Sequence, residues 1–206
     1  MYKKYVKRLL DIVFSLLLLI ILTPLFLVIM LAICIDSKGG PFFRQERIGL
    51  NEKVFWIYKF RSMTENSEHT GSGVYSDDND PRVTRMGRLL RRHSMDELPQ
   101  FINVLRGDMS FIGPRPPLTY HPWPLSQYTA EQRRMFTVRP GLTGWAQVNG
   151  RRSVEWNERI RLNNWYVDHL TFGLDCKIVW KTVRAVLTND NNANTGPTVP
   201  PPPATS

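Results

Sequence analysis

The longest uniform feature of the sequence is an apolar segment near its start. Ile12 to Ile35 comprises 24 residues without a charged side chain, and as one helix it would be about 36 Å long at about 1.5 Å per residue. That length is enough to cross the hydrocarbon core of a bilayer, and it exceeds what a small globular core usually hides. The run is also too long for a secretory signal peptide. The sequence therefore predicts a membrane-embedded segment within residues 1–36.

Two features predict that this segment enters and leaves the membrane on the same side. Pro24 removes a backbone donor near the middle, and Thr23 can supply a substitute hydrogen bond, so we expect a kink at this pair. Basic residues flank both ends, and the positive-inside preference therefore places both ends in the cytosol. We favour a re-entrant helix-break-helix over one straight span. The flanking basic residues are Lys3, Lys4, Lys7 and Arg8 before the segment, and Lys38, Arg44 and Arg47 after it.

The patterns after residue 37 predict one compact cytosolic domain that is mainly α with a little β. The aromatic stretch 54–61 is typical of a strand, and it places Lys59 and Arg61 at its end. Apolar residues at spacings of three and four predict four helices. They cover residues 82–92, 101–105, 153–167 and 174–187.

The ends of this domain have distinct characters. The helix predicted over 174–187 is basic and carries Trp180 among its apolar residues, so it could lie on anionic lipid, although packing against the core is the commoner fate of such a helix. From residue 189 the chain is rich in Asn, Thr and Pro, which predicts a disordered tail over 189–206. The predicted catalytic domain is therefore residues 37–188.

Composition adds the sign of the expected partner. The 27 Lys and Arg residues exceed the 18 Asp and Glu residues, which gives a net charge of +9. Such a charge favours partners that carry phosphate, whether nucleic acid, anionic lipid or nucleotide. The only cysteines are Cys34 and Cys176, which excludes a disulfide framework and a cysteine-based metal site.

One acidic pair stands out as candidate chemistry. Asp96 and Glu97 are adjacent and follow Arg91 and Arg92 closely. Two carboxylates that can share a divalent cation beside arginines suit phosphoryl transfer, because a carboxylate can attack phosphorus while positive groups offset the developing charge. Ser94-x-x-Glu97 is also a capping-box pattern that begins a helix. From these residues alone, the helix cap is the favoured interpretation.

Three further stretches are candidates for binding. Asp78-Asn79-Asp80 has the Asp-x-Asp form that can hold a hard cation, but a solvated turn is the commoner role of such a loop. The loops at 113–117 and 139–144 are rich in Pro and Gly. Each could hold an arginine such as Arg115 rigidly, could present amide groups to a phosphate, or could be a simple turn.

The ordered series of motifs resembles the bacterial sugar transferase family, the monotopic polyprenyl-phosphate phosphoglycosyl transferases. The resemblance extends from residue 2 to about residue 188 in the family's order, and so many long motifs make it specific. Because no further membrane domain precedes Lys7, we expect the small, minimal catalytic form. The matching stretches are Lys7-Arg8-x-x-Asp11, Thr23-Pro24, 43–49 (FRQERIG), 58–63 (YKFRSM), 94–100 (SMDELPQ), 103–110 (NVLRGDMS), 113–116 (GPRP), 140–144 (PGLTG) and 146–151 (AQVNGR).

The resemblance implies an activity and a location. The family carries a re-entrant membrane helix and interfacial amphipathic helices on the cytosolic face of the bacterial inner membrane. It uses Mg²⁺ to transfer a sugar 1-phosphate from a UDP-sugar to undecaprenyl phosphate, with release of UMP, in the first membrane step of polysaccharide or glycoprotein assembly. The expected partners are therefore this donor, this acceptor and anionic lipid head groups, but not nucleic acid. The sequence leaves a homodimer open.

Residue by residue, the resemblance implies that Asp96 is the nucleophile, Glu97 its partner in the dyad, and Arg91 a phosphate-binding residue. Mg²⁺ would lie near Asp96 and Glu97. Lys59, Arg61 and Arg115 are further candidates for contacts to the donor.

A different class of protein remains as the alternative. A basic, membrane-tethered protein that binds nucleic acid or anionic lipid without catalysis would account for the charge and for the arginine-rich helix. It would not account for the Asp96-Glu97 pair or for the motif series. Salt-dependent binding to DNA that exceeds binding to a UDP-sugar would favour it.

Overall fold

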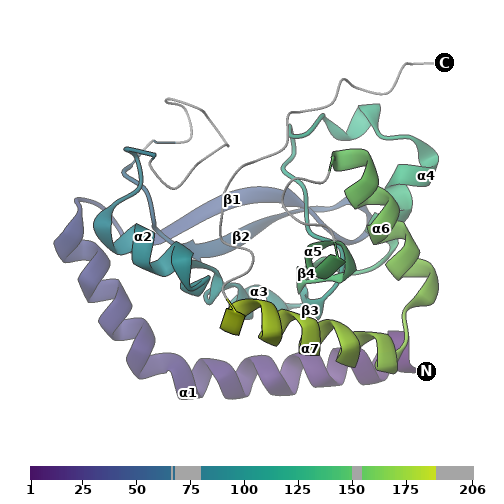
Figure 1. Ribbon diagram of the computed structural model, residues 1–206, viewed down its shortest axis with the longest axis horizontal. Helices are drawn as coiled ribbons and strands as arrows, with labels where there is room; N and C mark the ends of the chain where they lie inside the picture. Colours follow the sequence, from purple (N-terminus) through teal and green to yellow (C-terminus); the bar gives the residue numbers. More distant parts are fainter. Residues whose placement is uncertain (66, 68–79, 150–154, 189–206) are drawn as a thin grey trace.

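The apolar segment and the domain that follows it pack against each other. In a computed structural model, residues 1–65, 67, 80–149 and 155–188 are described. Figure 1 shows the first long helix along the lower edge of the molecule, with the strands and the other helices above it. The helices are α1 (Lys7–Asp36), α2 (Arg85–Arg92), α3 (Gln100–Arg106), α4 (Ala130–Arg133), α5 (Trp145–Asn149), α6 (Trp156–His169) and α7 (Phe172–Thr188), and the strands are β1 (Phe42–Ile48), β2 (Val54–Phe60), β3 (Ser110–Ile112) and β4 (Gly141–Thr143).

The described part is mostly helical with two small sheets, which confirms the predicted balance of α and β. Helix α2 begins three residues later than predicted, because the Thr84 hydroxyl accepts from the Gly87 amide at 2.9 Å and forms the N-cap. The predicted strand and the other predicted helices correspond to β2, α3, α6 and α7. The predicted tail, 189–206, lies outside the described residues.

Helix α1 is one continuous helix of 30 residues that bends partway along its length (Figure 1). The predicted break is therefore a bend within a helix. Pro24 lies inside α1, and the Thr23 hydroxyl donates to the Leu19 carbonyl at 2.7 Å. Proline is a usual cause of such a bend, because it lacks the amide donor and displaces the preceding turn.

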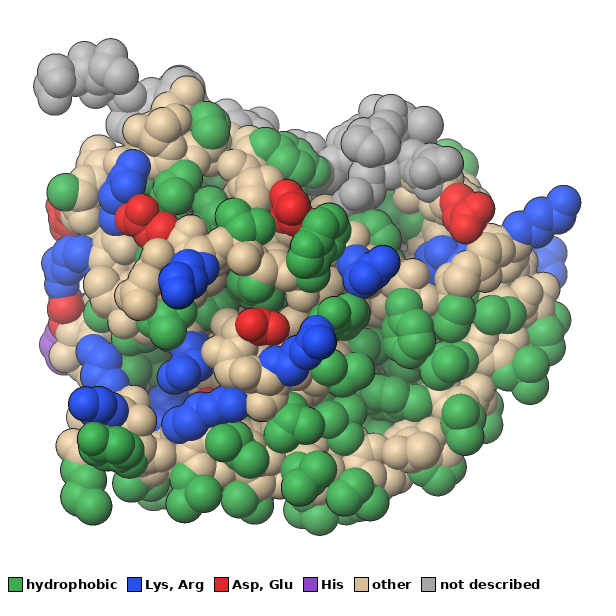
Figure 2. Space-filling view, turned by 180° about the vertical axis from the view of Figure 1, so that it is seen from behind, with side chains coloured by type: hydrophobic (Ala, Val, Ile, Leu, Met, Phe, Trp, Pro, Cys, Tyr) green, Lys and Arg blue, Asp and Glu red, His purple; other side chains and the backbone are tan. Residues whose placement is uncertain are grey.

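The outer face of α1 is apolar and exposed. The most apolar 18 residues within the helical stretch Tyr2–Asp36 have a mean hydropathy of 3.2, and only 11 % of them are buried by the rest of the protein. This is the only described helix long and apolar enough to cross a membrane. Figure 2 shows hydrophobic side chains gathered along the lower edge, where α1 lies. Exposed apolar residues of α1 include Leu9, Val13, Phe14, Leu16, Leu17, Ile20, Ile21, Leu27, Val28, Leu31 and Ile35.

The inner face of α1 belongs to the core of the domain. Ile29 and Ile33 are 2 % and 1 % exposed, and they pack in one cluster with Phe60 of β2 and Leu90 of α2. Met95 and Leu98, on either side of the Asp96-Glu97 pair, pack against the same cluster. The second half of α1 therefore supports the acidic pair from below.

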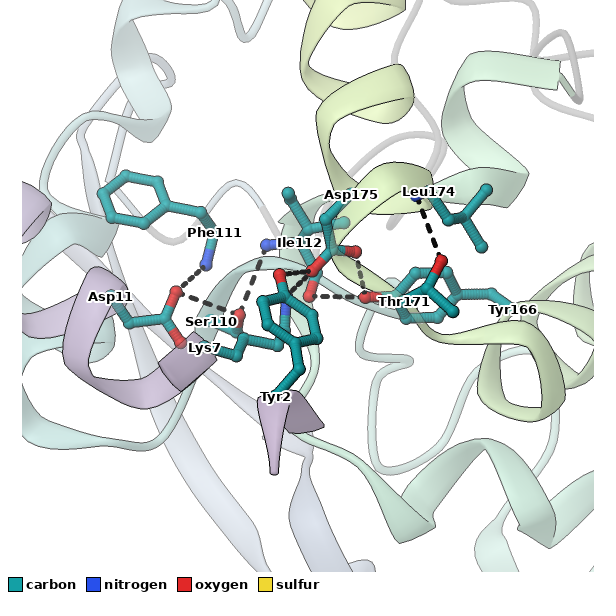
Figure 3. Close-up of polar contacts among 10 residues, drawn as sticks. All are labelled: Tyr2, Lys7, Asp11, Ser110, Phe111, Ile112, Tyr166, Thr171, Leu174 and Asp175. Carbon is teal, nitrogen blue, oxygen red and sulfur yellow. Dashed lines mark hydrogen bonds and ion pairs between the residues drawn. The ribbon is translucent and has the colours of Figure 1, made fainter. Parts of the chain in front are cut away.

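The first turns of α1 are fixed to the domain by a buried polar network (Figure 3). Asp175 of α7 is 3 % exposed; its carboxylate lies 2.6 Å from the Lys7 ammonium and accepts from the hydroxyls of Tyr2 and Tyr166. Asp11 accepts from the Ser110 hydroxyl at 3.0 Å, and it also accepts from the next backbone amide. Lys7 and Asp11 of the first motif therefore join the start of α1 to α7 and β3.

The far end of α1 is fixed to the same domain. The Asp36 carboxylate accepts from the Met86 amide at 2.9 Å, at the start of α2. The Arg61 guanidinium donates to the carbonyls of Ser37, Lys38, Gly39 and Gly40 and to the Ser37 hydroxyl. Both ends of α1 are thus attached to one domain.

Strands β1 and β2 form an antiparallel hairpin whose register decides which side chains share a face. Arg47 lies opposite Phe55, and Phe43 lies opposite Lys59. Because side chains alternate along a strand, Arg47, Ile57 and Lys59 point to the same side of the hairpin.

The two Pro/Gly-rich loops pair with each other. Strands β3 and β4 are parallel, with Ser110 beside Gly141 and Ile112 beside Thr143. A Cβ atom added to Gly141 would lie 2.0 Å from the backbone nitrogen of Gly113. The close backbone contact therefore requires glycine at position 141, and it fixes the loop that carries Arg115.

Candidate active site

Asp96 and Glu97 lie in a short 3₁₀ turn, Met95–Glu97, between α2 and α3. Ser94 before it has a left-handed backbone (φ 54°), and its hydroxyl makes no capping hydrogen bond. Helix α3 begins only at Gln100, and the Glu97 carboxylate is directed to Lys59 instead of to the Ser94 amide. The capping-box interpretation is therefore wrong, and the acidic pair is free for another role.

Glu97 is held ionised by two basic side chains. Its Oε1 lies 2.8 Å from the Lys59 ammonium and 3.5 Å from the Arg115 guanidinium. Burial alone raises the pKa of Glu97, but the positive charges of Lys59 and Arg115 outweigh it and lower the pKa to about 2. Glu97 therefore carries a negative charge throughout the physiological range.

The pKa of Asp96 shifts in the opposite direction, upward. Burial raises the pKa of its carboxyl group above the ordinary value, and the negative charge of Glu97 adds to this effect. The positive charges of Lys59 and Arg91 oppose the rise without cancelling it. Arg91 is oriented by its Nε, which donates to the Ser62 hydroxyl at 2.9 Å. Two adjacent carboxyl groups with opposite shifts are typical of catalytic pairs.

A small pocket begins at Glu97. The shared face of the hairpin contributes Arg47, Ile57 and Lys59, and the loop after β3 contributes Arg115 and Pro116. The remaining wall comes from Gln100, Gly141 and Leu142. Three cationic side chains around one carboxylate make this pocket suited to an anion.

The adjacent carboxyl groups of Asp96 and Glu97 could contribute oxygen ligands to a magnesium ion. Mg²⁺ is commonly held by one or two carboxylates together with substrate phosphates, rather than by an all-protein cage. Within the described residues, no group of three or more His, Cys, Asp and Glu side chains could hold a metal. Asp96 and Glu97 therefore fit Mg²⁺ only in combination with a ligand that brings its own oxygens.

Comparison with known proteins decides the family. The sequence profile described as "Bacterial sugar transferase" matches residues 2–189, nearly all of the part described here. The chain belongs to the bacterial sugar transferase family. Its similarity to individual members agrees with this assignment.

Three relatives of this sugar transferase span a range of lengths. An uncharacterized sugar transferase, EpsL, of Bacillus subtilis is 43 % identical over 185 residues, which are 89 % of this chain and 88 % of that protein. The UDP-glucose:undecaprenyl-phosphate glucose-1-phosphate transferase of Caulobacter vibrioides is 44 % identical over 90 % of this chain and 71 % of its own length. The undecaprenyl-phosphate galactose phosphotransferase of Salmonella typhimurium is 38 % identical over 91 % of this chain, but the match spans only 41 % of that protein.

The structure brings together most of the predicted site residues of the transferase. Lys59 and Arg115 contact Glu97, and Arg91 lies near enough to influence the pKa of Asp96. Their roles toward a substrate stay predictions. Of the four residues predicted to set the position of the apolar helix, Lys7 and Thr23 make the contacts given above, Pro24 lies inside α1, and Arg8 donates to two carbonyls at the end of α3.

The geometry does not support Arg61 as a contact to the donor, and it does not support metal binding by Asp80, which was the less favoured interpretation of that loop. Arg61 directs all three guanidinium nitrogens to the loop after α1, so it holds that loop and does not reach toward Glu97. Asp80 is 5 % exposed, and it pairs with Arg82 at 2.6 Å as part of a buried turn. The other acidic residue of that motif, Asp78, lies outside the described residues.

Sequence reasoning missed Arg47 and Gln100 as site residues. The sequence places Arg47 in the basic flank of the apolar segment and in the motif 43–49, but gives it no role in the site. In the structure Arg47 lines the pocket, and its charge helps to lower the pKa of Glu97. Pairing 42–48 with 54–60 as a hairpin would have placed Arg47 on the face of Lys59. Gln100 carries no charge, and it is part of the same motif as the acidic pair, so nothing in its type distinguished it.

Proposed function

We propose that this sugar transferase moves a sugar 1-phosphate from a UDP-sugar to undecaprenyl phosphate. The observation that carries the proposal is the Asp96-Glu97 pair: the pKa of Asp96 is raised, the pKa of Glu97 is lowered, and Glu97 lines a cationic pocket. The names of the Caulobacter and Salmonella relatives describe transfers to the same lipid phosphate. The sugar itself is not specified by these residues.

Asp96 is the nucleophile of this mechanism. A carboxylate whose pKa is raised is more basic than an ordinary aspartate, and it is therefore a better nucleophile when ionised. Its oxygen forms a bond to the β-phosphorus of the donor, the bond from that phosphorus to the bridging oxygen breaks, and UMP leaves with the oxygen. An oxygen of undecaprenyl phosphate then attacks the same phosphorus and displaces Asp96, which yields the lipid diphosphate sugar.

The surrounding residues hold charge in place during both steps. Lys59 and Arg115 are already positioned by Glu97, so they need little rearrangement as negative charge develops on the phosphoryl oxygens. Arg91 offers a third positive charge near Asp96. Mg²⁺ bound beside Asp96 and Glu97 would offset part of the diphosphate charge.

The attachment of both ends of α1 to one domain supports a re-entrant position in the bacterial inner membrane. Tyr2 and Lys7 contact Asp175 at one end, while Asp36 and Arg61 make contacts at the other. A straight span would carry one end to the opposite side of the bilayer, away from the domain. The basic residues on both flanks support a cytosolic position for this shared side. Single cysteines at Tyr2 and Ser37 should therefore both be protected from an impermeant reagent in intact cells, and labelling of the first alone would contradict the topology.

The covalent intermediate gives the direct test of the activity. The enzyme given a UDP-sugar without lipid acceptor should release UMP and gain the mass of one phosphosugar on the peptide that contains Asp96. A panel of UDP-sugars would identify the donor. Absence of both UMP and the adduct with every donor would contradict the proposal and would favour the non-catalytic alternative, for which DNA binding with a strong salt dependence is the positive test.

A further inference from the structure

The pocket beside Glu97 contains a buried amide group that the fold leaves unused. Gln100 is 2 % exposed, and it lines the pocket together with Arg47, Lys59 and Arg115. Within the described part of the chain, its Nε2 has no hydrogen-bond acceptor. Native proteins pair the large majority of their buried polar atoms, so an unpaired donor at a pocket wall is available to a ligand that brings an acceptor.

The packing of α3 does not require an amide at this position. The next inward-facing residues of the helix, Phe101 and Val104, are apolar and buried, and they contribute to the contacts of α3 with its neighbours. A methionine of nearly the same length would fill the volume of Gln100 without an unpaired donor. The amide therefore serves something other than the core.

The charges around the amide define the chemistry of that ligand. Arg47, Lys59 and Arg115 face one carboxylate, Glu97, whose Oε1 already pairs with Lys59 and Arg115. A ligand that enters must therefore bring negative charge and several acceptor oxygens. A phosphoryl group meets both conditions, whereas a sugar hydroxyl or a nucleobase carbonyl meets only the second.

We propose that Gln100 is a positioning residue for the donor, whose Nε2 donates to a non-bridging phosphoryl oxygen of the UDP-sugar diphosphate. The cations supply most of the attraction, and the amide adds a hydrogen bond that fixes the rotation of the phosphoryl group relative to Asp96. The inference rests on the proposed transfer reaction. A phosphoryl oxygen could also come from undecaprenyl phosphate, and the two half-reactions of the transfer separate these sources.

The test compares Gln100→Met with Gln100→Glu in the full-length enzyme. In a double-displacement reaction, kcat/KM for each substrate reports its own half-reaction. Gln100→Met should lower kcat/KM for the UDP-sugar by roughly 10- to 100-fold, as expected for loss of a hydrogen bond to a charged group. It should leave kcat/KM for undecaprenyl phosphate within about threefold of the wild-type value, and it should not lower the melting temperature, because it removes an unpaired buried donor.

Gln100→Glu distinguishes a phosphoryl partner from a hydroxyl partner. A carboxylate at this position repels a phosphoryl oxygen, so the loss in donor kcat/KM should exceed that of Gln100→Met. A sugar hydroxyl could donate to the carboxylate, so a milder loss than in the methionine variant would overturn the phosphoryl assignment. Gln127→Leu, at an exposed glutamine outside the pocket, is the control and should match the wild type.

Three further outcomes would overturn the assignment of Gln100 to the donor. An unchanged donor kcat/KM in Gln100→Met, or a loss confined to the acceptor half-reaction, overturns the donor assignment. A fall in melting temperature that parallels the lost activity makes the residue structural and equally overturns it. If the wild type releases UMP from its UDP-sugar while Gln100→Met releases it equally well, only this inference fails; if the wild type releases none, the proposed function itself fails.

Discussion

Asp96 and Glu97 are neighbours in the chain, yet their environments favour different protonation states. Glu97 faces Lys59 and Arg115, and its pKa falls to about 2. For Asp96, burial raises the pKa by more than the nearby cations lower it, so the net shift is upward. A pair of this kind can keep one permanent negative charge beside a second carboxylate that is basic enough to react.

Asp96→Asn should abolish turnover without weakening the fold. The raised pKa means that ionised Asp96 destabilises the folded state at pH values above that pKa, and the neutral amide removes this cost. UMP release should fall below detection, while the melting temperature should be equal to or higher than that of the wild type. A variant that melts clearly lower, or that releases UMP at the wild-type rate, would contradict the assignment of Asp96 as nucleophile.

Glu97→Gln should have the opposite effect on stability. It removes the partner of Lys59 and Arg115, and we expect a loss of about 1–3 kcal/mol in the free energy of unfolding at neutral pH. Because the pKa of Glu97 is lowered, its contribution is complete above the ordinary value of 4.5 and is lost as the pH falls toward about 2. Denaturant titrations along this pH range should therefore show the difference between wild type and variant shrink; a difference independent of pH would argue against the ion pairs.

Among the elements, the pairing of the two glycine-containing loops aims Arg115 at Glu97. Gly141→Ala would place a Cβ atom 2.0 Å from a backbone nitrogen, which forces β3 and β4 apart. We expect a loss of about 1–3 kcal/mol or more in stability, as for overpacking elsewhere, together with reduced UMP release. Gly173→Ala is the matched control, because a Cβ atom there meets nothing within 4 Å. Equal melting temperatures for the two variants would show that the loop contact is not required.

Elements with a strong local pattern were predictable from the sequence, and elements that depend on distant partners were not. The aromatic run gave β2 directly, whereas β1 was missed because the polar run at 44–47 hides its alternation. The short strands β3 and β4 are defined by their pairing across the two loops, a contact between distant parts of the chain.

In the site, too, local sequence features were predictable, and side-chain directions that depend on distant contacts were not. The family resemblance supplied the role of Arg91, which also lies near the acidic pair in sequence. The end of the predicted strand pointed to Lys59, and a Pro/Gly-rich loop pointed to Arg115. Arg61 follows Lys59 by two residues, but its direction depends on where the loop after α1 returns, since four carbonyls of that loop accept from it. The tertiary structure therefore determines whether the Arg61 guanidinium binds a ligand or the loop after α1.

For the whole molecule, the buried network around Asp175 connects the first and last helices. Asp175→Asn would leave Lys7 buried without its charge partner, and removal of one member of such a pair typically costs about 3–5 kcal/mol. We expect a marked fall in melting temperature in detergent or lipid nanodiscs. The double variant Lys7→Met with Asp175→Asn should recover part of this loss, because no charge is then left unpaired. Additive losses in the double variant would show that the two residues do not depend on each other.

The packing of Ile29 and Ile33 beneath Met95 and Leu98 has a consequence for how the two substrates arrive. With α1 embedded as proposed, the Asp96-Glu97 pair is held at one height relative to the bilayer surface, because the helix that enters the lipid also forms the floor of the site. The lipid phosphate then has to search only within the plane of the membrane, at a depth fixed by its own hydrocarbon chain. In the proposed position, the nucleotide sugar would arrive from the three-dimensional volume of the cytosol. The encounter rate with the acceptor would then depend on the surface density of the acceptor, and the encounter rate with the donor on the bulk concentration of the donor.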